Sequence, residues 1–296
     1  MSSYLVKVRK KMSIYAQRRV RGVFAGNYGS VFKGRSMDFD DLREYNYGDD
    51  VKDIDWNATA RSRNIMVRRY IAIRKHNILI VADNSNAMAA LAPSGETKAD
   101  VAAFCAGTLA YIAQKHGDLV GLVAGNHEST MRFPLKEGTA YIENFLDKYY
   151  KSIKVESPAA DMNAVLTYIS KAFRERMFLI VITDSGSALK IDRSIIRKLG
   201  ARHEQMFCIV EDAPLTSSFL HTKEARDIEK DLRIPRFLRS DRSLAKAETS
   251  YREAQRQVIK RTLRHYGIVT SFIDSSDHAI PRIIQMLEEQ KNARRR

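Results

Sequence analysis

The sequence predicts an α/β fold built on a doubly wound, mostly parallel β-sheet, and three observations support this. Short runs rich in Val, Ile and Leu alternate with longer segments of helical periodicity, which is the pattern of repeated β-α-β units. Residues 77–82 and 177–183 have no alternating polar positions, which is typical of strands buried on both faces. Residues 118–125 and 130–135 are strand-like runs joined by a short polar segment, which predicts one antiparallel hairpin.

The remaining elements follow from the same periodicities. Residues 1–22 are basic with irregularly spaced apolar positions, which predicts a helical arm docked on the surface rather than a membrane-binding helix. Residues 22–34 are interrupted by glycines and predict a loop or a short strand, whereas residues 65–73 predict a strand that leads into the buried one. The other expected helices are 98–116, 139–151, 161–173, 191–199, 250–266 and 279–289, and the other expected strands are 206–210 and 268–273.

The chain is expected to form two parts. Residues 1–75 contain the basic arm and an acidic, aromatic segment, and we expect them to pack on a main domain that spans residues 76–296. Residues 216–243 are dense in charge without a clear period, which predicts a surface excursion of the main domain. With 296 residues, of which 44% are hydrophobic, the chain is long enough to bury a substantial core.

Composition and charge narrow the classes of function. The sequence has no apolar run of the ~20 residues that a membrane span requires and no signal-peptide pattern, so we expect a cytoplasmic protein. Cys105 and Cys208 lie in apolar contexts and are expected to be buried free thiols. The net charge is +15, with nine Lys or Arg and no acidic residue in 1–36 and a basic tail at 291–296. These ends predict an acidic partner surface, whether nucleic acid, anionic lipid or protein.

Polar residues follow both of the buried strands. Asp83, Ser85 and Asn86 come after the first strand, and Asp184 comes after the second. Because the carboxyl ends of parallel strands meet at one edge of an open sheet, where ligands bind, we expect these four residues to line a docking crevice. The alternative is that Asp83 or Ser85 merely caps the following helix.

Residues 38–61 form the most unusual segment of the chain. They combine eight carboxylates with the only tryptophan, Trp56. A solvated acidic surface does not require aromatic residues, so we expect some of the carboxylates to be held by arginines. A structural network is favoured over metal binding or acid–base catalysis, because structural ion pairs also perturb carboxylates. Gly48 predicts a turn. The arginines available are Arg43, Arg61, Arg68 and Arg69.

This segment and the strand after it resemble the domain of unknown function 58 family, bacterial and archaeal proteins with a von Willebrand factor A-like fold. The family pattern is a glycine-rich entry, an acidic and aromatic stretch that ends in I-D-W-x-x-x-A-R, and then D-x-S-x-S-M. Asp38 stands where the family usually has Glu. We expect the motif to hold its segment against the sheet. The matching residues are Asp38, Phe39, Arg43, Tyr45, Gly48, Asp49, Asp50, Ile54, Asp55, Trp56, Ala60 and Arg61.

The resemblance implies a degenerate metal-ion-dependent adhesion site. Von Willebrand A-like domains often hold a divalent ion through the D-x-S-x-S loop, a threonine of a second loop and an aspartate after a later strand. Ala87 and Ala160 stand here where two hydroxyl ligands are usual. We therefore expect no more than weak binding of Mg²⁺ or Mn²⁺, with water completing the shell. The expected ligands are Asp83, Ser85, Asp184 and Asp161.

The resemblance also implies a partner. Family members are associated with MoxR-type AAA+ ATPases in the chaperone-like assembly or maturation of protein complexes. The sequence contains no phosphate-binding loop, no zinc cluster and no nucleophile with a placed base, so we expect a non-enzymatic adaptor with Asp83, Ser85, Asn86 and Asp184 at the partner contact. Two alternatives are a salt-dependent nucleic-acid-binding protein acting through its basic termini and a divalent-metal-dependent hydrolase.

Overall fold

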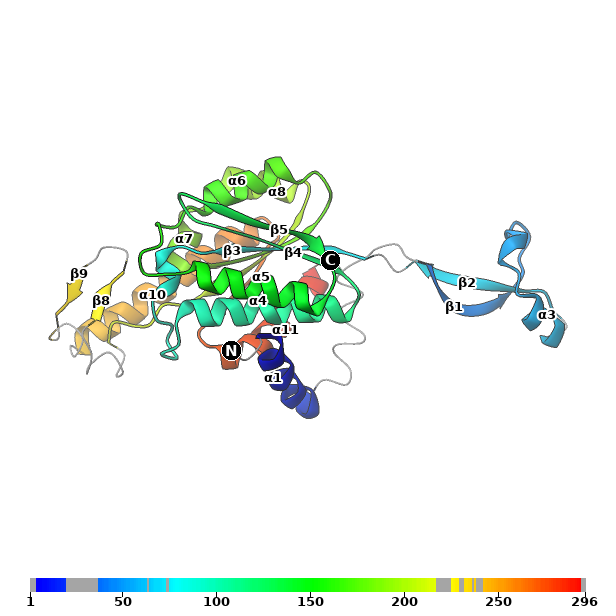
Figure 1. Ribbon diagram of the computed structural model, residues 1–296, viewed down its shortest axis with the longest axis horizontal. Helices are drawn as coiled ribbons and strands as arrows, with labels where there is room; N and C mark the ends of the chain where they lie inside the picture. Colours follow the sequence, from blue (N-terminus) through cyan, green and yellow to red (C-terminus); the bar gives the residue numbers. More distant parts are fainter. Residues whose placement is uncertain are drawn as a thin grey trace. The chain divides into compact units, whose positions relative to one another are not determined.

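The computed structural model describes residues 4–19, 37–62, 64–72, 75–216, 225–228, 232–235, 237 and 242–293. The chain divides into two units, which we call the sheet unit (residues 1–31 and 77–296) and the motif unit (residues 32–76) (Figure 1). The N-terminal helix therefore belongs to the sheet unit, whereas the sequence analysis grouped it with the motif segment. Packing of the motif unit on the sheet unit stays a prediction.

The sheet unit is built on six strands in the order β10-β7-β6-β3-β4-β5. Five run parallel, and β5 pairs with β4 in antiparallel register. If these six strands are renumbered 1 to 6 along the chain and read from the β5 edge, their order is 3-2-1-4-5-6, which is the doubly wound arrangement. The predicted fold class and the predicted hairpin are therefore confirmed. The strands are β3 (Asn77–Asp83), β4 (Leu119–Gly125), β5 (Thr130–Lys136), β6 (Phe178–Asp184), β7 (Glu204–Val210) and β10 (Val269–Ile273).

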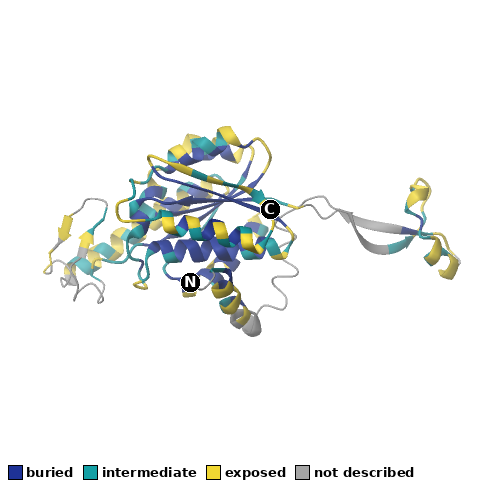
Figure 2. Ribbon diagram, in the orientation of Figure 1, coloured by how far each residue is buried: buried dark blue, intermediate teal, exposed yellow. Residues whose placement is uncertain are grey.

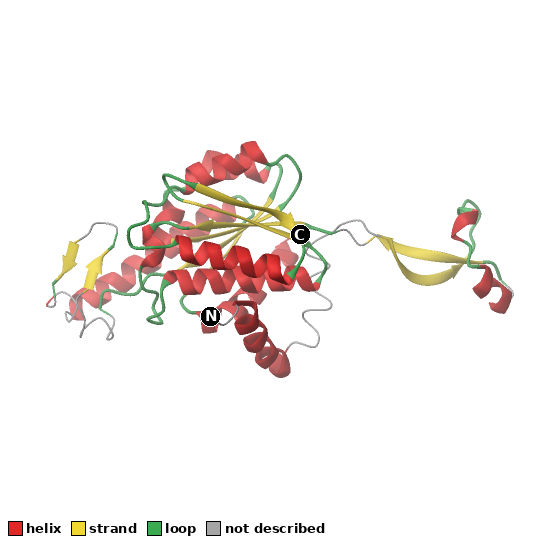
Figure 3. Ribbon diagram, viewed as in Figure 1, coloured by secondary structure: helices red, strands yellow, loops and turns green. Residues whose placement is uncertain are grey.

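Helices cover both faces of this sheet (Figure 3). On one face α4 (Lys98–Lys115) contacts α1 (Tyr4–Arg19), α5 (Thr139–Ser152) and α11 (Ser276–Ala293). On the other face lie α6 (Met162–Ala172), α8 (Arg193–Gly200) and the C-terminal part of α10 (Arg242–His265). A short helix, α7 (Ser185–Leu189), follows β6 directly. None of the described helices is long and apolar enough to cross a membrane.

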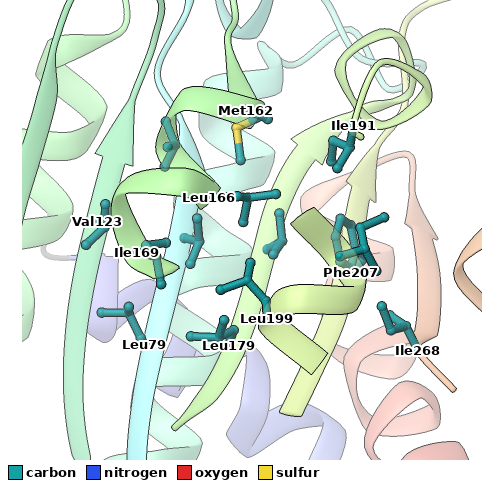
Figure 4. Close-up of a cluster of buried hydrophobic side chains, with 14 of the residues drawn as sticks. Leu79, Val123, Met162, Leu166, Ile169, Leu179, Ile191, Leu199, Phe207 and Ile268 are labelled. Atoms are coloured by element: carbon teal, nitrogen blue, oxygen red, sulfur yellow. The ribbon is translucent and has the colours of Figure 1, made fainter. Parts of the chain in front are cut away.

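The core lies between the sheet and these helices (Figure 2). Alternate residues of a strand point to opposite faces, so Leu79 and Val81 of β3 pack beneath α6 and α8. Leu166, Ile169 and Leu199 of these helices belong to the same buried cluster, which Figure 4 shows together with Leu79. Strand β3 is central in the sheet and buried on both faces, which explains its unbroken apolar sequence.

Helix α1 is docked on the sheet unit, as its sequence predicts. Leu5, Val8 and Met12 are its buried positions. The Glu143 carboxylate of α5 accepts hydrogen bonds from the free backbone N–H groups of Tyr4 (3.1 Å) and Leu5 (2.6 Å) at the start of α1. An acidic group at this end of a helix satisfies unpaired donors and complements the helix dipole.

The motif unit is a β-hairpin with a structured tip. Strand β1 (Met37–Glu44) pairs antiparallel with β2 (Met66–Ala72). Between them lie a 3₁₀ turn, η1 (Val51–Asp53), and helix α3 (Trp56–Ser62). The sequence pattern predicts β2 but not β1, because aspartate is disfavoured in strands and four acidic residues obscure the pattern of β1.

Three other expectations differ from the structure. Helix α10 begins at Arg242, whereas the sequence predicted a start at residue 250. Helix α7 was not predicted, because its five residues are too few to show periodicity. The charged excursion contains a two-stranded ladder of β8 (Ala225–Asp227) and β9 (Leu232–Ile234). The loop or strand expected at 22–34 lies outside the described residues.

Candidate functional site

The candidate site lies at the carboxyl ends of the adjacent strands β3 and β6. The connection after β3 runs through α4 on one face of the sheet, and the connection after β6 runs through α8 on the other. Ligands of doubly wound proteins bind at such a switch point, because the two connections separate there and leave a crevice. Asp83 ends β3 and Asp184 ends β6, so the structure brings these two predicted residues together.

Asp83 is completely buried, and both of its carboxylate oxygens are engaged. Oδ1 accepts a hydrogen bond from the backbone N–H of Ser85 (2.9 Å), and Oδ2 accepts one from the Thr183 hydroxyl (3.1 Å). Burial and the nearby Asp184 carboxylate raise the pKa of Asp83, and the hydrogen bonds from Ser85 and Thr183 oppose that rise. Thr183 was not predicted as a site residue, because its β-branched side chain fits an ordinary strand.

A buried lysine pairs with Asp184 and with a third aspartate, Asp212. Lys98 Nζ donates to Asp184 Oδ2 at 2.8 Å and also to Asp212 Oδ1, and the lysine side chain is 1% exposed. Although burial opposes ionisation, the two carboxylates raise the pKa of Lys98 and so favour its charged form. The pKa of Asp184 is lowered by Lys98, against the effect of its burial. We call Asp83, Lys98, Thr183, Asp184 and Asp212 the lysine-centred cluster.

Sequence reasoning missed Lys98, although one signal was present. Lys98 is the first residue of α4, directly after the N-cap Thr97, where a lysine is ordinarily solvated. However, the following Ala99, Val101 and Ala102 are all buried, so this helix is apolar on nearly every side. A lysine at such a position must be paired, because Lys is almost never fully buried otherwise.

The second oxygen of Asp184 has a structural role. Oδ1 accepts a hydrogen bond from the backbone N–H of Ser187 (2.7 Å), which makes Asp184 the N-cap of α7. Asp212, which follows β7, is the accessible acid of the cluster, because its side chain is 41% exposed. The cluster therefore has a rigid buried part and one carboxylate at the solvent boundary.

The residues after Asp83 form a buried turn. Ser85 is completely buried and precedes a short 3₁₀ helix, η2 (Asn86–Ala89), but its side chain makes no capping hydrogen bond. The backbone N–H of Asn86 donates to the Pro158 carbonyl (3.1 Å). The alternative is that Asp83 or Ser85 merely caps the following helix. The side chain of Ser85 makes no capping hydrogen bond, and Asp83 accepts its backbone hydrogen bond from Ser85, which precedes the helix.

Asp161, the fourth expected metal ligand, has a different local role. Its Oδ1 accepts a hydrogen bond from the backbone N–H of Ala164 (2.9 Å), which makes it the N-cap of α6. Its Oδ2 lies 3.6 Å from His127 Nδ1. Among the contacts of the described residues, none joins Asp161 to Asp83 or Asp184.

These donors do not fit a divalent ion well. Both oxygens of Asp83 and both of Asp184 already accept hydrogen bonds from the protein. The described part of the chain contains no group of three or more His, Cys, Asp or Glu side chains that converge on one point. Mg²⁺ and Mn²⁺ prefer several free oxygen ligands, whereas the centre of this cluster is an ammonium group. Weak Mg²⁺ or Mn²⁺ binding stays a prediction for titration to test.

A groove opens beside the lysine-centred cluster. Its volume is about 510 Å³, and it lies between α10 and the residues that follow β6 and β7. Arg252 of α10 fixes one wall by donating to the backbone carbonyls of Asp212 (2.6 Å) and Ala213 (2.7 Å). Ion pairs border the groove, since Arg256 pairs with Glu211. Its apolar lining comes from Leu215, Leu244, Ala247 and Tyr251.

The motif unit is organised by its own carboxylates. Arg43 donates to both oxygens of Asp49, with Nη1 to Oδ2 at 2.7 Å and Nη2 to Oδ1 at 2.6 Å, which confirms that an arginine holds one of these acids. Hydrogen bonds from Arg43 and the backbone of Asn46 lower the pKa of Asp49. Gly48 has φ of +106°, a conformation that glycine adopts readily, and it forms the predicted turn.

The other motif residues act locally as well. Asp50 Oδ1 accepts a hydrogen bond from the Lys52 N–H, and Asp55 Oδ1 accepts hydrogen bonds from the N–H groups of Asn57 and Ala58 at the start of α3. Trp56 is 64% exposed, so within the motif unit it does not form a core. Of the remaining motif residues, Tyr45 is half-buried and Arg61 is exposed. The side chains of Arg68 and Arg69, which were possible partners of the carboxylates, lie outside the described residues.

The sheet unit is thus a doubly wound α/β domain with a buried cluster of acids around a lysine at its switch point. The chain belongs to the family described as "Protein of unknown function DUF58", whose model matches residues 41–214, more than half of the chain. This confirms the resemblance found in the sequence. The matched segment runs from the motif unit through β3, β6 and β7 to the wall of the groove.

Curated relatives cover most of the chain. The proteins named "Uncharacterized protein Rv1480" of Mycobacterium tuberculosis (strain ATCC 25618 / H37Rv) and "Uncharacterized protein Mb1516" of Mycobacterium bovis (strain ATCC BAA-935 / AF2122/97) are each 24% identical to it over 271 residues. The alignments span 89% of this chain and 82% of each relative. The likeness therefore includes both the motif unit and the sheet unit.

Similar solved structures include von Willebrand type A domains. An aerotolerance-related membrane protein from Bacteroides fragilis NCTC 9343 aligns with a TM-score of 0.45 and 18% identity, over 72% of this chain and 99% of that one. A von Willebrand factor type A protein from Catenulispora acidiphila aligns with a TM-score of 0.39 and 11% identity, over 76% and 45%. Because these scores lie below 0.5, it is the strand order of this chain that establishes its fold.

Proposed function

We propose that this protein is a non-enzymatic interaction module that works with a MoxR-type AAA+ ATPase in the chaperone-like assembly or maturation of protein complexes. The observation that carries the proposal is the groove beside the lysine-centred cluster, which lies where doubly wound proteins bind their ligands. Membership of the DUF58 family supports it, because the resemblance implies an ATPase of this class as partner.

The chemistry of the cluster favours docking over catalysis. Lys98 has a raised pKa and stays protonated, so it is not available as a base or a nucleophile. Asp83 is completely buried with both oxygens engaged, so a substrate has no access to it. Asp184 is held by Lys98 and by the start of α7. None of these three groups is placed to transfer a proton to a bound molecule.

The groove has the composition of a protein-binding surface. Leu215, Leu244 and Tyr251 give it an apolar floor, whereas the Arg256–Glu211 and Arg252–Glu248 pairs form a charged border. Protein interfaces commonly combine an apolar centre with a polar rim. The sequence predicts the partner contact at Asp83, Ser85, Asn86 and Asp184, but Asp83, Ser85 and Asp184 are buried. We therefore place the ATPase contact at the neighbouring groove instead, with Asp212 as its accessible acid.

The experiment that tests this proposal measures binding of the purified protein to the AAA+ ATPase recovered with it from native lysate. Ala247 is exposed and lines the groove, whereas Ala254 is exposed on the same helix outside the groove lining. Ala247→Arg and Ala254→Arg add the same charge and the same bulk. We expect Ala247→Arg to weaken binding at least about tenfold, or ~1.4 kcal/mol, and Ala254→Arg to leave it unchanged. Failure to recover an ATPase, or equal effects of the two variants, would contradict the proposal.

A second candidate function rests on helix α1. Lys7, Arg9 and Lys10 are exposed on this helix, while Leu5, Val8 and Met12 are buried. Such a basic surface suits non-specific nucleic-acid binding, whose affinity falls steeply with salt. The test is fluorescence anisotropy with single- and double-stranded DNA at several salt concentrations. A salt slope that is unchanged by Lys7→Glu together with Lys10→Glu would remove this candidate.

A further inference from the structure

The ammonium group of Lys98 lies at the edge of the sheet where the loop after β3, which contains Asp83 and Ser85, meets Asp184 at the end of β6. Lys98 reaches the carboxyl edge from the first turn of α4 and is almost completely buried. Its ammonium lies 2.8 Å from Asp184 Oδ2 and also contacts Asp212. Asp184 and Asp83 are two of the three acids that the family resemblance assigns to a divalent ion, the third being Asp161.

We propose that the Lys98 ammonium replaces a divalent ion at this site and that neither Mg²⁺ nor Mn²⁺ binds there, in contrast to the weak binding that the resemblance implies. The proposal concerns the site itself and does not rest on the identity of the partner. It assigns Lys98 the role of the cation toward Asp184, one of the expected ligands, and adds Asp212, which was not among them, as the second carboxylate partner.

Charge balance supports this assignment. Two carboxylates, those of Asp184 and Asp212, are in direct contact with one ammonium, and Asp83 ends the strand next to the one that Asp184 ends. A divalent ion placed among these acids would be repelled by Lys98, and this repulsion is strong in a buried site of low dielectric constant. Binding such an ion would therefore require Lys98 to leave the cluster.

The ligand geometry supports it as well. Each carboxylate oxygen of Asp83 and Asp184 that an incoming ion would use already accepts a hydrogen bond, from Ser85 and Thr183 to Asp83 and from Lys98 and Ser187 to Asp184. Ala87 is buried at the third position of the D-x-S-x-S pattern and supplies no hydroxyl. Among the expected ligands, the carboxylate oxygens of Asp83 and Asp184 are thus already engaged by protein donors, whereas the buried Ser85 hydroxyl has no hydrogen-bond partner among the described residues.

The test compares metal binding and thermal stability of three proteins. Wild type is titrated with Mn²⁺ by isothermal calorimetry, and its Tm is measured in EDTA and in about 5 mM Mn²⁺, where a bound ion would raise it. Lys98→Ala removes the ammonium. Lys115→Ala is the matched control, because Lys115 is exposed at the other end of the same helix.

We expect wild type and Lys115→Ala to bind no Mn²⁺ and to keep the same Tm in both buffers. Lys98→Ala is expected to melt several degrees lower in EDTA and to recover part of that loss in Mn²⁺, because the ion then neutralises the freed acids. One Mn²⁺ bound per wild-type chain and lost in Asp184→Asn would overturn the proposal, and so would a Lys98→Ala protein as stable as wild type in EDTA. If Lys98→Ala does not fold, the wild-type titration still decides the matter.

Discussion

Lys98 and Asp184 are 86 positions apart in the chain, yet their charged groups lie 2.8 Å apart with side chains that are 1% and 4% exposed. Each of the two ions has lost its water, so the stability of each depends on the other. The pair joins the first turn of α4 to the end of β6 and therefore fixes a helix of one face to the centre of the sheet.

Removing one charge of this pair should be costly, and the cost should depend on burial. Asp184→Asn leaves Lys98 with the half-exposed Asp212 as its carboxylate partner, and we expect a loss of about 3–5 kcal/mol in the free energy of unfolding. Asp212→Asn should cost less, because that carboxylate is 41% exposed and water replaces part of its interaction. Urea unfolding of both variants measures the difference. Equal losses would show that burial does not control the strength of these pairs.

Asp83 should make the protein less stable at neutral pH than at mildly acidic pH. Its folded pKa is raised above its unfolded value of about 4, so its stabilising contribution is present below pH ~4 and is lost as pH rises through the folded pKa. Asp83→Asn should therefore reduce the fall in the free energy of unfolding between mildly acidic and neutral pH. Urea unfolding across this range checks the slope, and a slope equal to that of wild type would contradict the assignment.

Asp184 should affect the pH dependence of the free energy of unfolding in the opposite direction. Because Lys98 lowers its pKa, the contribution of Asp184 is present above its unfolded value and is lost only as pH falls through the lower folded value. Acid unfolding of wild type and Asp184→Asn measures this contribution directly. We expect the variant to have a shallower acid transition, and an identical transition would show that the Lys98 pair does not contribute to acid stability.

In the motif unit, Asp55 and Trp56 should differ in importance although they are neighbours. Asp55 accepts two backbone hydrogen bonds at the start of α3, so Asp55→Ala should cost about 1 kcal/mol through the lost cap. Trp56 is 64% exposed, so Trp56→Ala should change the free energy of unfolding by less than about 0.5 kcal/mol unless the motif unit packs on the sheet unit. Chemical denaturation measures both values. A large loss for Trp56→Ala would support that predicted packing.

The two cysteines should be chemically silent in the folded protein. Cys105 and Cys208 are completely buried, and burial raises the pKa of Cys105 well above its usual value and that of Cys208 to about 12. The thiolate is the reactive form, so a thiol reagent such as DTNB should react only after unfolding. Unfolded protein in guanidinium is the control and should release two equivalents. Rapid reaction of the native protein would contradict this burial.

Much of the sheet and of its candidate site could be predicted from local sequence. Residues 77–82 and 177–183 are apolar because their strands are buried on both faces, and this places Asp83 and Asp184 at one edge. Lys98 could not be assigned in this way, because its partners Asp184 and Asp212 are 86 and 114 positions away. Pairing over such distances depends on the tertiary structure, which periodicity does not encode.

In the motif segment, too, local contacts could be predicted from the sequence whereas contacts between distant residues could not. Its Arg43–Asp49 pair is predictable, because the two residues are six positions apart and flank a turn. Strand β1 was missed, because its carboxylates oppose the usual composition of strands and its pairing with β2 depends on a partner more than twenty residues away. The exposure of Trp56 also has no local signal, because tryptophan is ordinarily well buried.

The docking of α1 has a consequence for the order in which the protein is completed during synthesis. Lys11 donates to Ser276 Oγ (2.9 Å) and Asp277 Oδ1 (2.6 Å), which are 265 and 266 positions further along the chain. At about 5–20 residues per second, the ribosome needs roughly 13–53 s to make that intervening stretch. During this interval the basic N-terminal helix lacks its contacts to α11, so the nascent chain presents its positive charge before the finished fold neutralises part of it.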